Sequence, residues 1–137
     1  MNALELNGVT KSYPGFRLNN ISFALPAGCI LGLIGENGAG KSTTIRLILD
    51  MARRDSGEIK IWGRDNQKDS RLLKEEIGVV LDEASFPLGI TAKDVNHIMK
   101  HTYQHWEETT FYQYIRRFSL PLQKPFKDYS RGMKMKL

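Results

Sequence analysis

Residues 35 to 42 read Gly35-Glu36-Asn37-Gly38-Ala39-Gly40-Lys41-Ser42. They fit the pattern G-x-x-x-x-G-K-[ST], in which glycines let the backbone wrap closely around an anion and point its N–H groups inward. The run before them, Cys29–Ile34, is continuously apolar, which is typical of a strand buried on both faces. The run after them, Ser42–Met51, carries apolar residues at helical spacing. A strand, loop and helix in this order predict a phosphate-binding loop, and the same context disfavours an ordinary glycine-rich turn.

The residue types in this loop suit the binding of a nucleotide. We expect Lys41 to reach the β- and γ-phosphate oxygens, the Ser42 hydroxyl to coordinate Mg²⁺ and Thr43 to hydrogen-bond the α-phosphate. The positive N-terminal end of the following helix adds to the attraction for phosphate. The residues expected to bind the nucleotide in this segment are Gly35, Asn37, Gly38, Gly40, Lys41, Ser42 and Thr43.

The segments around the loop carry strand and helix patterns. Leu4–Val9 and Leu18–Leu25 alternate between apolar and polar residues on either side of a turn at Tyr13-Pro14-Gly15, so they predict an antiparallel hairpin. Further along, the patterns predict a strand at Glu58–Trp62, a helix at Lys68–Glu76 and a second buried strand at Ile77–Leu81.

From Thr91 onward the periodicity becomes helical. The apolar residues form two stripes, Val95, Ile98, Met99, Tyr103 and Trp106 in the first, and Phe111, Tyr114, Ile115 and Phe118 in the second. We therefore expect an α/β fold, a partial P-loop NTPase core with an antiparallel β-subdomain and a helical insertion. Residues 1–90 would form the β-subdomain and the first half of the P-loop core, and residues 91–137 the helical subdomain.

The composition is that of an ordinary folded protein. Of the 137 residues, 41% are hydrophobic, and 20 Lys and Arg against 15 Asp and Glu give a formal charge of +5. These proportions disfavour a disordered chain, the apolar runs are too short to cross a bilayer, and no export signal is evident. The charge fits nucleic acid, anionic lipid or phosphorylated ligands equally well. The single cysteine, Cys29, cannot form an internal disulfide, so we expect a buried thiol and a reducing, cytoplasmic compartment.

Several segments together resemble one family, the ATP-binding subunits of ABC transporters. Tyr13 occupies the position of the family's adenine-stacking aromatic residue, Gly35–Thr43 resembles its Walker A segment, and Ser56–Ile59 resembles the turn and strand after its first helix. The segment Asp128-Tyr129-Ser130-Arg131-Gly132-Met133-Lys134 resembles the family's signature segment, in the variant form of exporter-type members. The resemblance covers almost the whole chain, with the motifs in the family's order.

The resemblance implies ATP and Mg²⁺ as ligands. It assigns Tyr13 to adenine stacking, although an aromatic residue that covers the core at a strand end has the same pattern. It assigns the Ser130 hydroxyl and the Gly132 N–H to the γ-phosphate of ATP held by an opposite subunit, although Ser130 also fits a helix N-cap. Two such subunits would form a head-to-tail dimer on the cytoplasmic face of the cell membrane and power transport through a transmembrane permease. We expect the permease to contact the helical region and residues 82–90, with Phe86, Pro87 and Leu88 as apolar anchors.

Two features depart from the family pattern. Where the family usually has glutamine, this sequence has Asp82 as the candidate Mg²⁺ ligand, with Glu83 as the alternative, and a solvated acidic pair fits these positions as well. After Ser130, no run of four apolar residues is followed by Asp-Glu, so the family's Walker B aspartate and catalytic glutamate are not found, nor is its switch histidine. We therefore expect a chain truncated before Walker B, with Lys41 and Asp82 as catalytic candidates and no complete catalytic set.

Other interpretations of the sequence stay open. A soluble ABC-type ATPase that acts on nucleic acid or ribosomes is disfavoured by the exporter-like signature and by the lack of a basic aromatic surface, so no nucleic acid is expected. A module that binds nucleotide without hydrolysing it fits the 137 residues. His97, His101 and His105 have the spacing of a zinc site, but a helical wheel favours a solvated face. Arg53 and Arg54 fit cations at a helix C-terminus better than a contact with lipid or nucleic acid.

Overall fold

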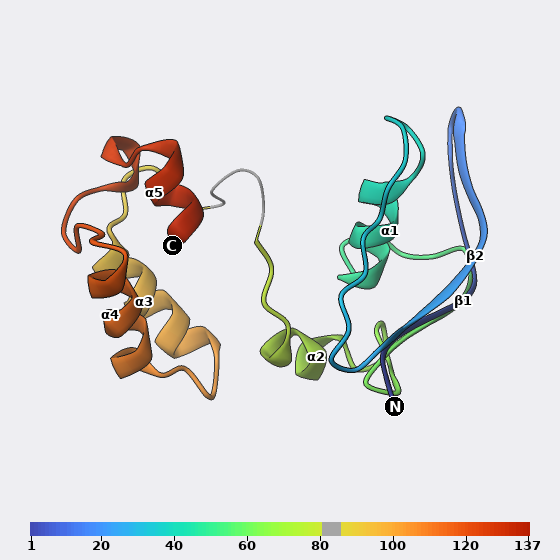
Figure 1. Cartoon of the computed structure of the whole chain (residues 1–137), viewed down its shortest axis with the longest axis horizontal. Coiled ribbons are helices and arrows are strands. Elements are labelled where there is room, and N and C mark those ends of the chain that lie inside the picture. The colour runs from blue at the N-terminus through green and yellow to red at the C-terminus, as the bar shows by residue number, and fades with distance from the viewer. Residues whose placement is uncertain (81–85) are drawn as a thin grey trace. The chain divides into compact units, whose positions relative to one another are not determined.

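The computed structural model describes residues 1–80 and 86–137, which divide into two units (Figure 1). The N-terminal unit is Met1–Glu76, and the helical unit is Ile77–Leu137. The N-terminal unit contains the strands and the glycine-rich loop, whereas the helical unit contains the segment that resembles the family signature.

The N-terminal unit is built on an antiparallel sheet with the strand order β2-β1-β3-β4. The strands are β1 (Asn2–Tyr13), β2 (Phe16–Pro26), β3 (Ser56–Ile61) and β4 (Arg64–Asp65). Tyr13 pairs with Phe16 across the turn at Pro14 and Gly15, which confirms the predicted hairpin. Leu6 and Val9 of β1 both lie in the core although they are three residues apart, because a register irregularity between them interrupts the regular alternation of the strand.

Helix α1 (Lys41–Ile48) covers this core. Its Leu47 side chain is 1% exposed and packs in one cluster with Leu6, Val9, Leu18 and Ile59, so the helix lies against the hairpin seen in Figure 1. Helix α2 (Ser70–Glu76) follows β4 and buries Leu73, in agreement with the predicted helix.

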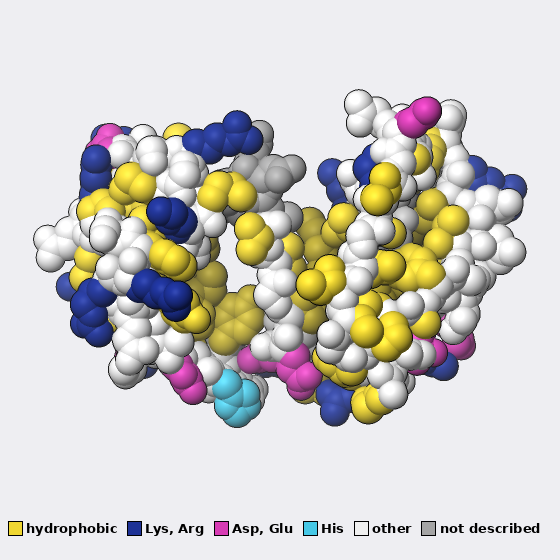
Figure 2. All heavy atoms as spheres, in the orientation of Figure 1, with side chains coloured by type: hydrophobic (Ala, Val, Ile, Leu, Met, Phe, Trp, Pro, Cys, Tyr) yellow, Lys and Arg dark blue, Asp and Glu magenta, His cyan; other side chains and the backbone are white. Residues whose placement is uncertain are grey.

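Two expected strands are not formed within the described residues. Cys29–Ile34 has no strand structure, and Ile30 and Ile34 are 100% and 97% exposed. Cys29 is exposed too, so the prediction of a buried thiol was wrong. Residues 77–80 also lack strand structure, and Leu81 lies outside the described residues. A buried strand needs hydrogen-bonding neighbours on both sides, and no described strand pairs with either segment. Figure 2 shows hydrophobic side chains on the surface of the N-terminal unit, and Ile30, Leu31, Leu33 and Ile34 are among its exposed hydrophobic residues.

The helical unit consists of α3 (Ala92–Thr102), α4 (Glu108–Arg117), the 3₁₀ helix η1 (Phe126–Asp128) and α5 (Arg131–Lys136). Thr91 and Asp94 form a capping box that starts α3. The core of this unit contains Val95, Phe111, Ile115, Leu120 and Phe126. The predicted stripes are therefore only partly buried: Ile98, Tyr114 and Phe118 are exposed. None of the helices in the described part of the chain is long and apolar enough to span a membrane.

A buried polar side chain, Asn96, joins α3 to α4 and was not anticipated from the sequence. Asn96 is 4% exposed, and its Oδ1 accepts a hydrogen bond from the Trp106 indole at 2.8 Å. Its Nδ2 donates to Glu108 Oε2 at 2.7 Å. Lys100 also bonds Glu108, and the Lys100 ammonium and the Asn96 amide hold the pKa of Glu108 below its usual value.

These contacts predict an acid-sensitive helical unit. Because the pKa of Glu108 is lower in the folded than in the unfolded chain, its stabilising contribution is present above the ordinary value of 4.5 and is lost as the pH falls through the folded value. The variant Glu108→Gln should therefore be less stable than the parent at neutral pH, and this difference should shrink in acid. Unfolding followed by Trp106 fluorescence, in a Trp62→Phe background, measures this; a difference that does not change with pH would contradict it.

Candidate functional site

The glycine-rich loop and the start of α1 form a pocket of about 380 Å³. Phe16 of β2 supplies one wall, and the remaining lining residues are Asn37, Gly38, Gly40, Lys41, Ser42 and Thr43. The structure thus brings together every loop and helix residue expected to bind nucleotide except Gly35, whose carbonyl lies next to the Lys41 side chain.

Gly40 fixes how closely the helix start approaches β2. Its φ is +96°, a left-handed conformation that disfavours side chains. A Cβ at this position would lie 2.8 Å from Leu18 Cδ1 and 3.2 Å from Phe16 Cζ. A glycine is therefore needed both for the backbone conformation and for the contact with the sheet.

The first turn of α1 presents backbone donors to the pocket. The Gly40 carbonyl accepts bonds from Thr44, at 2.8 Å from its amide and 2.9 Å from its hydroxyl. Gly40 has no side chain with which to cap the helix, so the amides of Lys41, Ser42 and Thr43, three residues that line the pocket, have no capping acceptor. The first turn contains no acidic residue, so the positive end of the helix is not offset there.

Lys41 folds back over the loop. Its Nζ donates to the carbonyl oxygens of Gly35 at 2.5 Å and Glu36 at 2.7 Å. A lysine ammonium has three N–H donors, so one is left for a further acceptor while these two bonds persist. The charge is therefore held at the pocket rather than extended into solvent.

The aromatic residue that lines the pocket is Phe16, which sequence reasoning missed. Tyr13, expected to stack on adenine, is 42% exposed at the end of β1. Its ring stacks on Phe16 with centroids 6.5 Å apart, and Lys11 Nζ lies 5.3 Å from the Tyr13 centroid. Tyr13 therefore lies beside the pocket wall rather than in it.

The other predicted site residues lie elsewhere in the chain. Ser130 caps α5 by accepting a bond from the Met133 amide at 3.2 Å, and Gly132 lies in the first turn of that helix. Both belong to the helical unit. Asp82 and Glu83 lie outside the described residues.

The donor set of the loop fits a magnesium ion that is bound mainly by phosphate. Ser42 is exposed and offers a hydroxyl oxygen at the pocket, while residues 1–80 and 86–137 contain no cluster of three or more His, Cys, Asp or Glu suited to a metal ion. Magnesium commonly takes only one or two protein ligands together with substrate phosphates and water. Ser42 is thus the candidate protein ligand among the described residues.

Two features of the helical unit do not suit a nucleotide. His97 and His101 are exposed, with ring centroids 4.4 Å apart, but His105 lies beyond the end of α3, so no three-histidine helical face forms. A pocket of about 520 Å³ runs along α4 and is lined largely by aromatic and aliphatic side chains, among them Phe111 and Ile115. Such a lining suits an apolar contact rather than a triphosphate.

Comparison with known proteins gives a family match. Residues 18–137 match the family model described as ABC transporter. The chain is 40% identical over 93 residues to the Nod factor export ATP-binding protein I of Rhizobium leguminosarum bv. viciae, covering 67% of this chain and 30% of that protein. It is 30% identical over 135 residues to the ABC transporter ATP-binding protein YtrB of Bacillus subtilis (strain 168), covering 98% of this chain and 46% of that protein. The chain thus spans less than half the length of these relatives.

Solved structures support the fold. An ATP-binding subunit of an ABC transporter matches 98% of this chain and 58% of its own length with a TM-score of 0.84 and 24% identity. The cbiO1 protein from Clostridium perfringens matches 98% of this chain and 58% of its own with a TM-score of 0.74 and 20% identity. The expected fold class, a P-loop NTPase core of mixed α/β type, is confirmed.

The geometry at Gly40 predicts a specific loss of nucleotide binding. In Gly40→Ala the new methyl group would press on Leu18 and Phe16 and lift the helix start, so we expect affinity for ATP to fall by about tenfold or more. The matched control is Gly63→Ala, which has a similar φ of +77° but open space around the Cβ position. Titration calorimetry measures both; equal affinities in the two variants would contradict the role of this contact.

Proposed function

Because the chain belongs to the ABC transporter family, we propose that it binds ATP in the pocket between Phe16 and the start of α1, as part of an ATP-binding subunit. The observation that carries this proposal is that the uncapped first turn of α1 lines one pocket together with Lys41 and the glycine-rich loop. Backbone donors, a helix N-terminus and a lysine together match the charge and shape of a polyphosphate.

We place the adenine next to the aromatic pair Tyr13 and Phe16. Phe16 lines the phosphate pocket, and the exposed Tyr13 ring extends the aromatic surface away from it. In this arrangement the polyphosphate lies along Gly38–Thr43, while Tyr13 stacks on the base. Mg²⁺ would be held by Ser42 and the phosphates, where it would neutralise charge on the β- and γ-oxygens, and Asp82 is its further candidate ligand.

For the whole subunit we propose ATP hydrolysis that drives transport through a membrane permease. The printed name of one relative is Nod factor export ATP-binding protein I, and cbiO1 is described as part of an ABC transporter complex. A head-to-tail pair of subunits would place Ser130 and Gly132 of one against the γ-phosphate of ATP on the other. The subunit would then lie on the cytoplasmic face of the cell membrane.

A surface for the permease is proposed at residues 86–90 and the helices of the helical unit. Leu88 is 61% exposed, which suits an apolar anchor. Phe86, in contrast, packs against Phe126 with ring centroids 5.5 Å apart, so its side chain contacts the core of the helical unit. The apolar contact with a permease would therefore rest on Leu88 more than on Phe86.

Nucleotide binding is tested directly with Lys41→Ala. Removing the ammonium that lies at the pocket should weaken ATP binding by about a hundredfold, because a charge-assisted contact to phosphate is lost and nothing replaces it. The control Arg71→Ala removes one positive charge from an exposed position on α2 and should leave affinity unchanged. Fluorescence of a labelled ATP analogue measures both affinities.

The same titration bears on the metal ion. With Ser42→Ala, added Mg²⁺ should strengthen ATP binding less than it does for the parent chain.

Equal binding by Lys41→Ala and the parent would reject the proposed site. ATP turnover by the 137-residue chain above the Lys41→Ala background would reject the alternative that this chain only binds nucleotide.

A further inference from the structure

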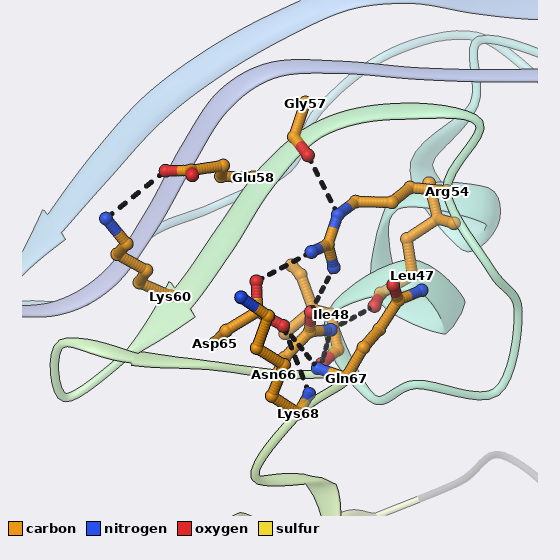
Figure 3. A network of polar contacts seen from close by, with 10 residues as sticks. All are labelled: Leu47, Ile48, Arg54, Gly57, Glu58, Lys60, Asp65, Asn66, Gln67 and Lys68. Atoms are coloured by element: carbon orange, nitrogen blue, oxygen red, sulfur yellow. Dashed lines mark hydrogen bonds and ion pairs between the residues drawn. The ribbon is translucent and has the colours of Figure 1, made fainter.

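The C-terminal end of α1 is held by one buried side chain, Asn66, which follows β4. Asn66 Nδ2 donates to the carbonyl oxygens of Leu47 at 2.6 Å and Ile48 at 3.0 Å (Figure 3). These carbonyls belong to the last turn, where the regular helix supplies no N–H donor for them. The backbone N–H of Asn66 donates to the carbonyl oxygen of Ile59 on β3 at 3.0 Å. This one residue therefore connects the end of the helix to the sheet. At 2% exposure, its bonds are shielded from water.

Arg54 fixes the orientation of Asn66. Its Nη1 donates to Asn66 Oδ1 at 2.7 Å, its Nη2 to Asp65 Oδ2 at 2.7 Å and its Nε to the Gly57 carbonyl at 2.9 Å (Figure 3). A guanidinium presents its donors in a fixed planar fork, so three acceptors around it define one position. Since Asn66 Oδ1 faces Arg54, its Nδ2 must face the helix carbonyls. We call Arg54, Asp65 and Asn66 the Arg54 clamp.

Asp65 keeps the clamp charged. Its Oδ1 accepts bonds from the amides of Gln67 at 3.0 Å and Lys68 at 3.1 Å. Burial opposes ionisation of this carboxyl, but the two amides and the Arg54 guanidinium outweigh it and hold the pKa of Asp65 below its usual value. The side chains of Arg54 and Asp65 are only 11% and 15% exposed, so their ion pair is weakly screened by solvent.

The position of α1 shapes the nucleotide pocket, because the pocket has walls on two different elements. Phe16 belongs to β2, whereas Lys41, Ser42 and Thr43 belong to α1. Any rotation or sliding of α1 against the sheet moves one wall relative to the other. An isolated helix of eight residues is unstable in water, so α1 takes its position from its contacts with the rest of the unit.

We propose that the Arg54 clamp positions α1 for phosphate binding, with Asn66 acting as a positioning residue for a site that it does not touch. This inference rests on the proposed function, since it concerns the affinity of the same pocket for ATP. The proposal gives Arg54 a different role from Arg53. Arg54 orients the Asn66 side chain that caps the helix, rather than acting only as a positive charge near the helix end. The competing explanation is that the clamp only adds to the stability of the N-terminal unit.

The deciding variant is Asn66→Asp. It keeps the size of the side chain and an oxygen for Arg54, but it replaces the donor at the helix end with an oxygen that faces the Leu47 and Ile48 carbonyls. We expect the Kd for ATP to rise by about tenfold, which corresponds to about 1.4 kcal/mol. The Kd for pyrophosphate should rise by a similar factor and the Kd for adenosine should not, because the phosphate-binding end of α1 is what moves.

The matched control is Ile61→Val, a substitution of a buried β3 residue that lowers stability without touching the end of α1. The Kd is measured at a temperature well below the unfolding midpoint, where circular dichroism shows that each variant is folded. Under these conditions a loss of stability alone leaves the Kd for ATP unchanged. If the Kd of Asn66→Asp for ATP lies within twofold of the values for the parent and for Ile61→Val, the positioning role is overturned. In that case Lys41→Ala still tests separately whether the pocket binds ATP. A parent chain that binds no ATP would overturn the proposed function, and this inference with it.

A second variant keeps the inference testable if Asn66→Asp does not fold. Arg54→Lys preserves the charge beside Asp65 but cannot also bond Asn66 and Gly57 in a fixed fork. We expect a smaller rise in Kd, about threefold, together with shifts of the Gly40–Thr43 amide signals in NMR spectra of the folded chain. Unshifted amides and an unchanged Kd in folded Arg54→Lys would overturn the proposal.

Discussion

The candidate site depends on the position of one short helix against an antiparallel sheet. Helix α1 is held at three levels: Gly40 lies against Phe16 and Leu18, Leu47 lies in the core, and Asn66 bonds the last turn. Each contact alone leaves the helix free to pivot about it. Together they fix the direction of the helix axis, and with it the direction in which the first-turn amides and their partial charge point.

The parts of this site that are local in sequence could be predicted from sequence. The glycine-rich loop, the hairpin of β1 and β2 and the start of α1 follow from residues close together in the chain, and the structure forms each of them. Phe16 could not be singled out, because an apolar residue next to a turn has the same pattern whether it packs in the core or lines a pocket. Only the approach of α1 to β2 gives Phe16 its place at the pocket.

Features that depend on distant partners were predicted poorly. Cys29–Ile34 has the composition of a buried strand, but composition supplies no hydrogen-bonding neighbour, and the described residues provide none. The reverse holds for Asn66 and Asn96, which are polar in sequence and buried in the structure. Asparagine is most often exposed, so nothing in the local pattern marks these two. Their burial follows from partners that the fold brings to them, Arg54 and the α1 carbonyls for one, Trp106 and Glu108 for the other.

The Ser130 hydroxyl has both an oxygen that accepts and a hydrogen that donates, so its two interpretations are compatible. Capping uses the Ser130 oxygen as an acceptor for the Met133 amide, and it leaves the hydroxyl hydrogen available to donate. A phosphate oxygen accepts hydrogen bonds and has none to give, so it would engage the group that capping leaves unused. The cap also orients the hydroxyl at the start of α5, where helix amides add further donors. Capping by Ser130 is therefore compatible with the role toward ATP on a second subunit that we propose for it, because the two uses engage different parts of the hydroxyl group.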